Sequence, residues 1–197
     1  IAYTDLLTAN LNIEHYVPEH YKQTFYIEKP TELQALPQKQ KEQITQAQNA
    51  IHLAHVLLEN FTNNYEEQYY EFNIPKASGG LRKISAPKES FKHALKTVQT
   101  IFKQIKCLPH SAAYAYIDNV SCKDALEKHQ KNKSKWFLKI DLTDFFTNCT
   151  EEFVYQQITQ LYPFYYFNEE SLEKLKQVIK ICCLHGSLPQ GSPISPL

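Results

Sequence analysis

Residues 135–146 have the residue types and spacing of a strand that ends in a metal ligand. The first part, WFLKI over residues 136–140, is largely apolar, and Asp141 follows where a helix or turn must begin. The pattern predicts a buried β-strand over residues 135–141 with a carboxylate at its end. Mg²⁺ prefers hard oxygen ligands from carboxylates and substrate phosphates, which makes this arrangement suitable for phosphoryl transfer. Taken alone, the segment is more typical of an Asp that caps a helix.

A second group of candidate residues flanks a glycine turn. Residues 68–76 and 81–86 have the composition of two strands, and Ala77–Gly80 has the turn chemistry of a β-hairpin. Lys76 and Arg82 would then lie near one another at the base of the tip. A planar guanidinium beside a compact ammonium suits a triphosphate. The residues by themselves favour a simple tight turn with solvated charges.

The third candidate is GSLPQGSP, residues 186–193. Two prolines and two glycines around Gln190 predict an irregular backbone at the start of a helix. Such a backbone aims the amide and several N–H groups at a ligand. Without the other two segments, it would be interpreted as a linker.

Helical periodicity accounts for most of the remaining chain. The helix predicted over 88–106 is amphipathic and basic, and Ser121–Asp124 is a capping box that begins a helix reaching about Lys131. Helices are also predicted over 4–14, 38–61, 150–161 and 169–184. Helices mixed with few strands predict the α+β class.

Charge is distributed unevenly along the chain. The net charge is zero, yet residues 71–141 hold 14 basic and 6 acidic groups, for a local net charge of +8. A local basic surface is what a polyanion needs, whatever the balance of the whole chain. Lysines that merely decorate amphipathic helices explain part of this charge equally well.

Composition describes a globular chain of 197 residues, 43% of them hydrophobic. No apolar run could span a bilayer and the start lacks the basic residues of a signal peptide, so we expect a cytoplasmic protein without a membrane partner. The five cysteines lack zinc spacing and are expected to be buried thiols. A metal cluster of His185 with Cys182 and Cys183 is disfavoured, because adjacent cysteines on a helix point in different directions.

Three ordered blocks resemble the reverse transcriptase family, in particular its bacterial retron, abortive-infection and group II intron types. They are Phe72–Pro87, Lys139–Phe146 and Leu188–Pro196. The resemblance implies the fingers and partial palm of a right-hand polymerase, helix-rich, with a fingers β-hairpin and a short antiparallel palm sheet. The expected organisation is a helical N-terminal extension (1–65), fingers (66–134) and a partial palm (135–197).

The resemblance assigns roles to residues of the central block. Asp141 would be a catalytic Mg²⁺ ligand, with Mn²⁺ as a substitute metal. Leu142 would add a main-chain carbonyl to the metal, and Leu142 and Thr143 would line the triphosphate site. Phe146 matches an aromatic ring that lies beneath the sugar and excludes a 2′-hydroxyl. Phe145 is then expected to pack in the core.

The other two blocks would complete the nucleotide site. Lys76 and Arg82 align with fingers residues that bind the phosphates of the incoming nucleotide. Gln190 and Gly191 align with a pair that contacts the nascent base pair and the template.

The segment around residues 110–129 resembles the family block where template or primer backbone passes. Tyr114, Tyr116, Ser121 and His129 are its candidate nucleic-acid contacts, because aromatic rings stack on bases without sequence preference. The two tyrosines could equally be core residues on an edge strand, which is the slightly favoured interpretation.

The chain departs from the family in one respect, since it contains no Asp-Asp pair. The family completes its metal site with two adjacent aspartates after Tyr or Phe and Ala, and Asp118, Asp124 and Asp144 lie at the wrong spacing to replace them. Because the first residue is not Met and Leu197 falls inside a motif, we expect a piece of a longer polypeptide. A chain that ended at Leu197 is expected to be inactive by itself.

The resemblance implies a nucleotidyltransferase that adds dNTPs to a primer 3′-hydroxyl by two-metal phosphoryl transfer. Its partners would be an RNA template, a DNA or RNA primer and dNTP, with a dedicated structured RNA as a further candidate. Two alternatives share the same residues. One is a non-catalytic nucleic-acid-binding module of this fold in phage defence or intron splicing, and the other is a template-independent polymerase.

Overall fold

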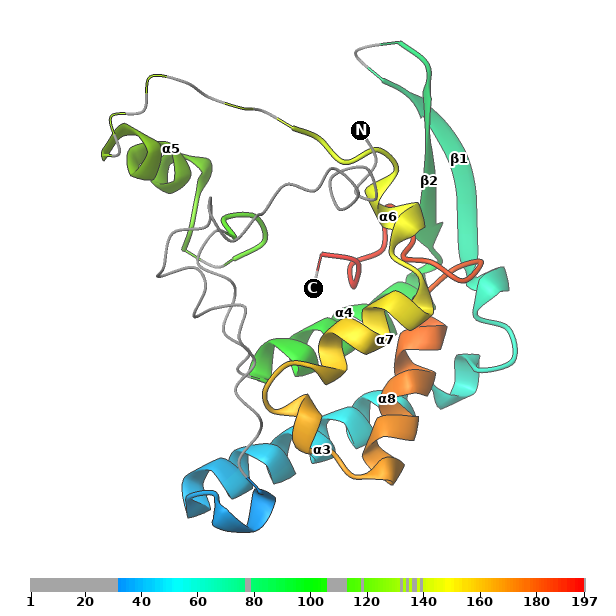
Figure 1. Ribbon diagram of the computed structural model, residues 1–197. Helices are drawn as coiled ribbons and strands as arrows, with labels where there is room; N and C mark the ends of the chain where they lie inside the picture. Colours follow the sequence, from blue (N-terminus) through cyan, green and yellow to red (C-terminus); the bar gives the residue numbers. More distant parts are fainter. Residues whose placement is uncertain are drawn as a thin grey trace, which may run out of the picture. The chain divides into compact units, whose positions relative to one another are not determined.

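The computed structural model describes residues 32–76, 79–105, 113–117, 119–131, 133, 135, 138 and 140–196 (Figure 1). The chain divides into two compact units, 1–36 and 37–197. The 3-10 helix η2 (Leu33–Ala35) lies in the first. The second contains, in chain order, α3 (Gln38–Leu58), η3 (Glu59–Phe61), η4 (Glu66–Gln68), β1 (Tyr69–Pro75), β2 (Leu81–Pro87), α4 (Glu89–Gln104), α5 (Cys122–Lys131), α6 (Phe145–Asn148), α7 (Glu151–Thr159), η5 (Phe164–Tyr166) and α8 (Glu169–Cys182).

Helices α3, α4 and α8 build the hydrophobic core of the second unit. Each carries an apolar stripe at helical spacing, and burying these stripes against one another is the main stabilising force. The fully buried side chains include Leu58 of α3, Phe91 of α4 and Leu175 of α8. The Phe91 ring centroid lies 4.8 Å from that of Phe61 and 5.6 Å, edge-on, from that of Tyr69. The helices predicted over 38–61, 88–106 and 169–184 are confirmed, with ends within a few residues.

Side-chain caps fix where the later helices begin. Thr150 Oγ1 accepts a hydrogen bond from the Phe153 amide at 3.2 Å at the start of α7. Asn168 Oδ1 accepts one from the Ser171 amide at 2.9 Å at the start of α8. Such caps satisfy amides that the first helical turn leaves without partners. The helix predicted to begin at the capping box of residues 121–124 is also confirmed, and one of the two bonds of the box is present, because the Ser121 amide donates to Asp124 Oδ2 at 2.7 Å.

The predicted β-hairpin is confirmed as the antiparallel pair β1 and β2, with Tyr69 opposite Pro87 at its base. The base is buried against the helices, while the tip is exposed. The Gly79 amide donates to the Lys76 carbonyl and the Lys76 amide to the Gly80 carbonyl, both at 3.0 Å. Gly79 and Gly80 have φ angles of 88° and 81°, a conformation that side chains with a Cβ rarely adopt.

Backbone hydrogen bonds join the C-terminal loop, residues 183–196, to other elements. Leu184 and Ser187 exchange amide–carbonyl bonds of 2.8 and 3.2 Å across a two-residue turn in which His185 and Gly186 have φ angles of 51° and 76°. Positive φ at both central residues is typical of a type I′ turn. Beyond this turn, the Leu188 amide donates to the Cys149 carbonyl at 3.0 Å and joins the loop to the residue that precedes Thr150. The loop is therefore a defined structure and not a linker.

The predicted buried strand over residues 135–141 is wrong for those of its residues that the structure describes. Leu138 and Ile140 are 87% and 77% exposed, and neither belongs to a strand. A strand needs a neighbour to satisfy its backbone groups, and in the described part of the chain β1 and β2 pair only with each other. The described residues thus form no palm sheet, whereas the helix-rich α+β class with a hairpin is confirmed.

Three of the four described cysteines, Cys149, Cys182 and Cys183, are buried free thiols as predicted. The prediction is wrong for Cys122, which is exposed because α5 buries none of its ten residues, all of them described. Cys107 and the helix predicted over 4–14 lie outside the described residues. The domain boundaries at 65 and 134 stay predictions.

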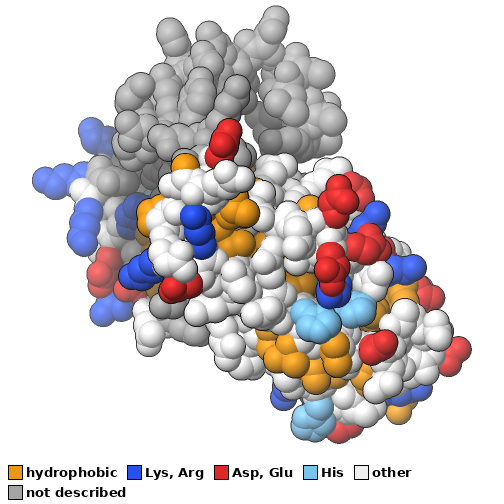
Figure 2. Space-filling model, turned by 90° about the horizontal axis from the view of Figure 1, so that it is seen from below, with side chains coloured by type: hydrophobic (Ala, Val, Ile, Leu, Met, Phe, Trp, Pro, Cys, Tyr) orange, Lys and Arg blue, Asp and Glu red, His pale blue; other side chains and the backbone are white. Residues whose placement is uncertain are grey.

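Charged side chains of both signs and a patch of apolar side chains share the face seen in Figure 2. On α3, Leu53 and Val56 are 51% and 46% exposed. None of the helices that the structure describes is long and apolar enough to cross a lipid bilayer.

Candidate functional site

A cleft of about 740 Å³ lies where the hairpin, the segment 141–147 and the C-terminal loop meet. This volume falls within the roughly 300–1,000 Å³ of small-molecule sites. Three segments far apart in the sequence therefore converge on one opening, as the family resemblance implies. The predicted site residues that line it are Lys76, Arg82, Asp141, Leu142, Thr143, Phe146 and Gln190.

The cationic wall of the cleft comes from the hairpin tip. Lys76 directly follows β1, and Arg82 pairs with Ile74 in the register of β1 and β2. Both side chains are exposed, and in the described part of the chain neither forms an ion pair with a carboxylate. Two positive charges without a partner at one opening create an attractive site for a polyanion.

The acidic wall is the segment from Asp141 to α6. Asp141 and Asp144 both line the cleft and are exposed. Asp144 has a φ angle of 51° and directly precedes α6, but its side chain caps nothing there. Instead, Asn148 Nδ2 donates to the Asp144 carbonyl at 2.9 Å and holds the turn together. The carboxylate of Asp144 is therefore free to face the cleft.

Gln190 reaches the cleft because the C-terminal loop docks on β2. The Ser85 amide donates to the Gln190 carbonyl at 2.9 Å, which ties the loop to the hairpin. Gly191, with φ of 117°, allows this approach, since a Cβ there would lie 3.0 Å from Ile84 Cγ2 and 3.1 Å from the Ser85 carbonyl oxygen. Gly191 is not among the residues that line the cleft. Its local effect is to bring the backbone of Gln190 against the strand.

The prediction that Phe145 packs in the core is wrong. Phe145 is 50% exposed and lines the cleft together with Phe146. Their ring centroids are 5.4 Å apart at an interplanar angle of 75°, an edge-to-face contact. Both rings lie on α6, a single turn with no buried residue, so the core does not reach this segment.

Glu71 and Lys83, which were not predicted as site residues, also line the cleft. Lys83 Nζ lies 2.8 Å from Glu71 Oε1, and the Ser85 hydroxyl donates to the same oxygen at 3.2 Å. The hydrogen bond from Lys83 is the main cause that holds the pKa of Glu71 below its usual range. The alternation of side chains along a strand predicts that Glu71, Lys83 and Ser85 share one face of the hairpin. Lys83 and Ser85 are two residues apart on β2, and Glu71 is opposite Ser85.

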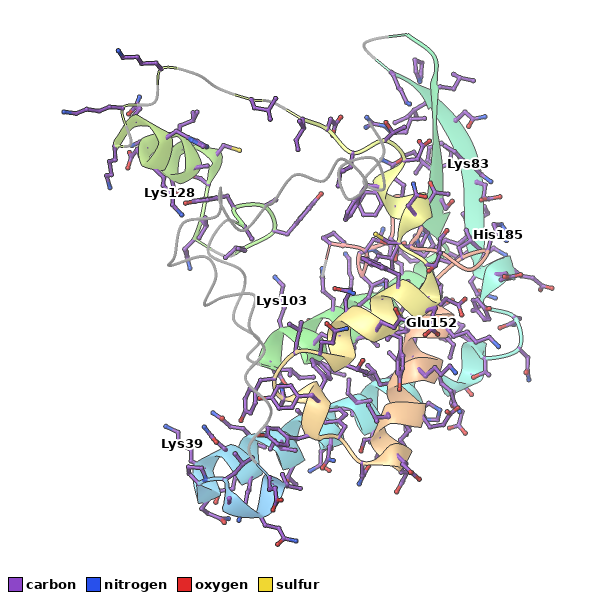
Figure 3. All side chains as sticks on the ribbon, in the orientation of Figure 1. Lys39, Lys83, Lys103, Lys128, Glu152 and His185 are labelled. Carbon is purple, nitrogen blue, oxygen red and sulfur yellow. The ribbon has the colours of Figure 1, made fainter. Side chains whose placement is uncertain are left out.

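His185 is a further lining residue, and it comes from the turn of the C-terminal loop. Its Nε2 lies 3.8 Å from Glu71 Oε1, and its Nδ1 lies 3.9 Å from Glu66 Oε1. Figure 3 shows Lys83 on the hairpin and His185 on the neighbouring loop. No local pattern in the sequence indicates this approach, since it depends on how the loop packs.

The candidate nucleic-acid contacts Tyr114, Tyr116, Ser121 and His129 do not line the cleft. Tyr114 lies beneath Lys128, with Nζ 5.9 Å from the ring centroid, and Tyr116 is 72% exposed with φ of 61°. The interpretation of the tyrosines as core residues on an edge strand is therefore wrong.

The donors on the acidic wall suit a hard divalent cation. Asp141 and Leu142 line the cleft, and a carboxylate and a main-chain carbonyl are the oxygen ligands that Mg²⁺ and Mn²⁺ accept. Within the described residues, no group of three or more His, Cys, Asp or Glu side chains is arranged to hold a metal. An ion at Asp141 would thus need further oxygens, such as those of substrate phosphates.

Comparison with known proteins identifies the family to which these features belong. Residues 74–197 match the family model described as reverse transcriptase (RNA-dependent DNA polymerase). The chain belongs to the reverse transcriptase family. The match includes the hairpin from Ile74 onward, the Asp141 segment and the C-terminal loop, which are the three walls of the cleft.

Two relatives are retron reverse transcriptases of Escherichia coli. The chain is 32% identical over 130 residues to the Retron Ec73 reverse transcriptase, which covers 64% of this chain and 40% of that protein. It is 33% identical over 92 residues to the Retron Ec83 reverse transcriptase, which covers 47% of this chain and 28% of that protein. The aligned region thus spans less than half the length of each relative. Both relatives are of the retron type, which is one of the three bacterial types that the sequence resembles.

Proposed function

We propose that this chain supplies the nucleotide-binding part of an RNA-directed DNA polymerase of bacterial retron type. The observation that carries the proposal is that Lys76, Arg82 and Asp141 line one cleft although they come from separate segments. The reaction is the template-directed transfer of a deoxynucleotide from dNTP to a primer 3′-hydroxyl. RNA is the template, and a DNA or RNA strand is the primer.

In this reaction, the primer 3′-oxygen attacks the α-phosphorus in line with the bond to the β-phosphate, which breaks to release pyrophosphate. Negative charge increases on the leaving group as that bond breaks. Lys76 and Arg82 at the hairpin tip would bind the β- and γ-phosphates and neutralise this charge. Arg82 can bind two phosphate oxygens at once through its planar fork, and Lys76 adds a point charge.

Asp141 and the main-chain carbonyl of Leu142 would hold Mg²⁺, or Mn²⁺ in its place, and the bound ion would activate the 3′-hydroxyl and offset phosphate charge. Thr143, next along the cleft wall, would contribute backbone groups near the triphosphate. The family uses two further aspartates for this purpose, and the sequence contains no Asp-Asp pair. The complete site therefore requires carboxylates from outside this sequence.

Phe146 and Gln190 would select the nucleotide. The Phe146 ring would lie beneath the sugar and collide with a 2′-hydroxyl, which favours deoxynucleotides. Gln190, with its backbone fixed on β2, would contact the nascent base pair, and Gly191 would keep it there. The exposed Phe145 ring beside Phe146 adds a second aromatic surface to the same wall.

Nucleic acid would pass over the remaining parts of the fingers (66–134) and partial palm (135–197). Tyr114, Tyr116, Ser121 and His129 would contact template or primer, and the lysines of α5 would add positive charge. The N-terminal extension (1–65) would bind a dedicated structured RNA or another subunit. Its helix α3 also packs against α4 and α8.

The test is primer extension on an RNA template by the full-length protein that contains this sequence. Asp141→Asn removes one charge at nearly constant volume and should lower the rate by at least on the order of 100-fold. Glu152→Gln is the matched control, because Glu152 is exposed on α7 and does not line the cleft (Figure 3). Equal rates for the Asp141→Asn variant and the unsubstituted protein would remove Asp141 from the mechanism.

Reactions without template, and with a DNA template, separate this proposal from its alternatives. Copying of the RNA sequence into DNA supports the proposal. Products whose sequence is independent of the template would indicate a template-independent polymerase. Tight RNA binding without incorporation would indicate a non-catalytic module.

A further inference from the structure

The ion pair of Glu71 and Lys83 has no role in the mechanism above. The two residues are diagonal neighbours on one face of the hairpin, because Glu71 pairs with Ser85 and Lys83 with Asn73. Their charged atoms are 2.8 Å apart. Both residues line the same cleft as Lys76 and Arg82. A third cation is therefore present at this opening, and it is held by a carboxylate.

This ion pair is easily broken. The Lys83 side chain is 60% exposed and that of Glu71 is 35% exposed, so water screens their attraction. A triphosphate presents several negatively charged oxygens to the same ammonium group. Charge-assisted hydrogen bonds to phosphate are among the stronger polar contacts. A nucleotide in the cleft can thus compete with Glu71 for Lys83.

Glu71 keeps other partners when Lys83 leaves. The Ser85 hydroxyl donates to Glu71 Oε1 at 3.2 Å, and His185 Nε2 lies 3.8 Å from the same oxygen. The carboxylate therefore keeps a hydrogen bond from the protein. The exchange of Lys83 from carboxylate to phosphate leaves no unsatisfied group behind.

We propose that Lys83 is a third cation of the triphosphate site, and that Glu71 is a positioning residue that holds it at the cleft wall until dNTP binds. The inference rests on the proposed function of the cleft. Lys76 and Arg82 differ from Lys83 because neither forms an ion pair with a carboxylate in the part of the chain that the structure describes. They would make the first contact with the nucleotide, and Lys83 would follow.

The experiment measures KM and kcat for dTTP in single-nucleotide incorporation by the full-length protein. Lys83→Gln should raise KM about 10-fold, with kcat little changed, because a charge-assisted contact to substrate is lost. Lys83→Arg, which keeps the charge, should restore most of this loss. Glu71→Gln should lower KM about 2-fold, since Lys83 then has no negatively charged partner that competes with the triphosphate. The double variant should resemble Lys83→Gln.

The control is Lys174→Gln, which breaks a 2.6 Å ion pair with Glu170 on α8, away from the cleft. It should leave KM unchanged. The inference is overturned if Lys83→Gln leaves KM unchanged, or if Glu71→Gln raises KM as much as Lys83→Gln does, which would indicate a purely structural ion pair.

Lys76→Gln, measured in parallel, separates this inference from the proposed function. If Lys76→Gln raises KM and Lys83→Gln does not, only the role of Lys83 fails. If neither changes KM, the cleft is not the nucleotide site, and both proposals fail. The same conclusion follows if the unsubstituted protein neither incorporates dTTP nor binds it in equilibrium titration with Mg²⁺.

Discussion

Two parts of the molecule differ in how they are held in place. In the packed part, which we define as α3, α4, α7, α8, the hairpin and the C-terminal loop, Phe91, Leu95 and Leu175 are fully buried. In the open part, which we define as the described residues from 113 to 148, no side chain is buried. The cationic wall of the cleft and Gln190 belong to the packed part. Asp141 and the two phenylalanines belong to the open part.

This difference separates the two chemical tasks that we propose for the cleft, triphosphate binding and metal binding. The triphosphate side is supported from within the chain, because the hairpin pairs with itself and the loop bonds to β2 at Ser85. Among the residues that the structure describes, the proposed metal side is supported by the turn at Asp144 and the single-turn helix α6. Catalysis requires the metal side to be held as rigidly as the triphosphate side. Contacts from substrate or from further structure must supply that rigidity.

The reactivity of the cysteines provides the largest expected contrast between the two parts. Burial raises the pKa of Cys183 to about 12, and burial also raises the pKa values of Cys149 and Cys182. Because the thiolate is the reactive form, these three should react with iodoacetamide at least on the order of 100-fold more slowly than the exposed Cys122. Mass spectrometry of the alkylated peptides at pH 8 measures the rates. Equal rates for Cys122 and Cys183 would contradict the packing of the loop.

Gly191→Ala should destabilise the packed part by about 2–4 kcal/mol. Its φ of 117° strains any residue with a Cβ, and the added atom would lie 3.1 Å from the Ser85 carbonyl oxygen and push the loop off β2. Urea unfolding measures the change. Gly186→Ala is the control, because it also has positive φ but open space around it, and should cost only about 1–2 kcal/mol. Equal effects of the two substitutions would show that the loop does not depend on the close approach.

Leu138→Ser tests the open part and should change the free energy of unfolding of this chain by less than about 0.5 kcal/mol. The reason is that Leu138 is 87% exposed, so its removal leaves no cavity. Leu175→Ala, in the packed part, should cost about 2–5 kcal/mol in the same urea titration. A cost above about 2 kcal/mol for Leu138→Ser would instead support the buried strand predicted from the sequence.

Local patterns in the sequence were sufficient for the helices and the hairpin of the packed part. The helices follow from apolar spacing and caps such as Asn168, and the hairpin follows from its glycine turn. The prediction of a buried strand over 135–141 was wrong because an apolar run becomes a buried strand only where a neighbouring strand is available to pair with it. The prediction that Phe145 packs in the core was wrong for a related reason, since apolar character does not decide which of two adjacent rings contacts the core.

The convergence of the three site segments could be predicted only through resemblance to a family, since no spacing rule connects Lys76, Asp141 and Gln190. The Glu71–Lys83 pair could be predicted from strand alternation, once the hairpin register is assumed. The position of His185 could not be predicted, because its approach to Glu71 depends on the turn of the C-terminal loop and on how that loop docks. Long-range contacts of this kind are set by tertiary packing and leave no periodic signal in the sequence.

The most direct measurement of the central claim is a structure of the full-length protein with an RNA template, a primer that ends in a dideoxynucleotide, incoming dTTP and Mg²⁺. The account predicts triphosphate oxygens within about 3.5 Å of Lys76 Nζ and the Arg82 guanidinium, with Asp141 facing the α-phosphate from the opposite wall. A triphosphate bound outside this cleft, or an Asp141 carboxylate that points away from it, would contradict the account.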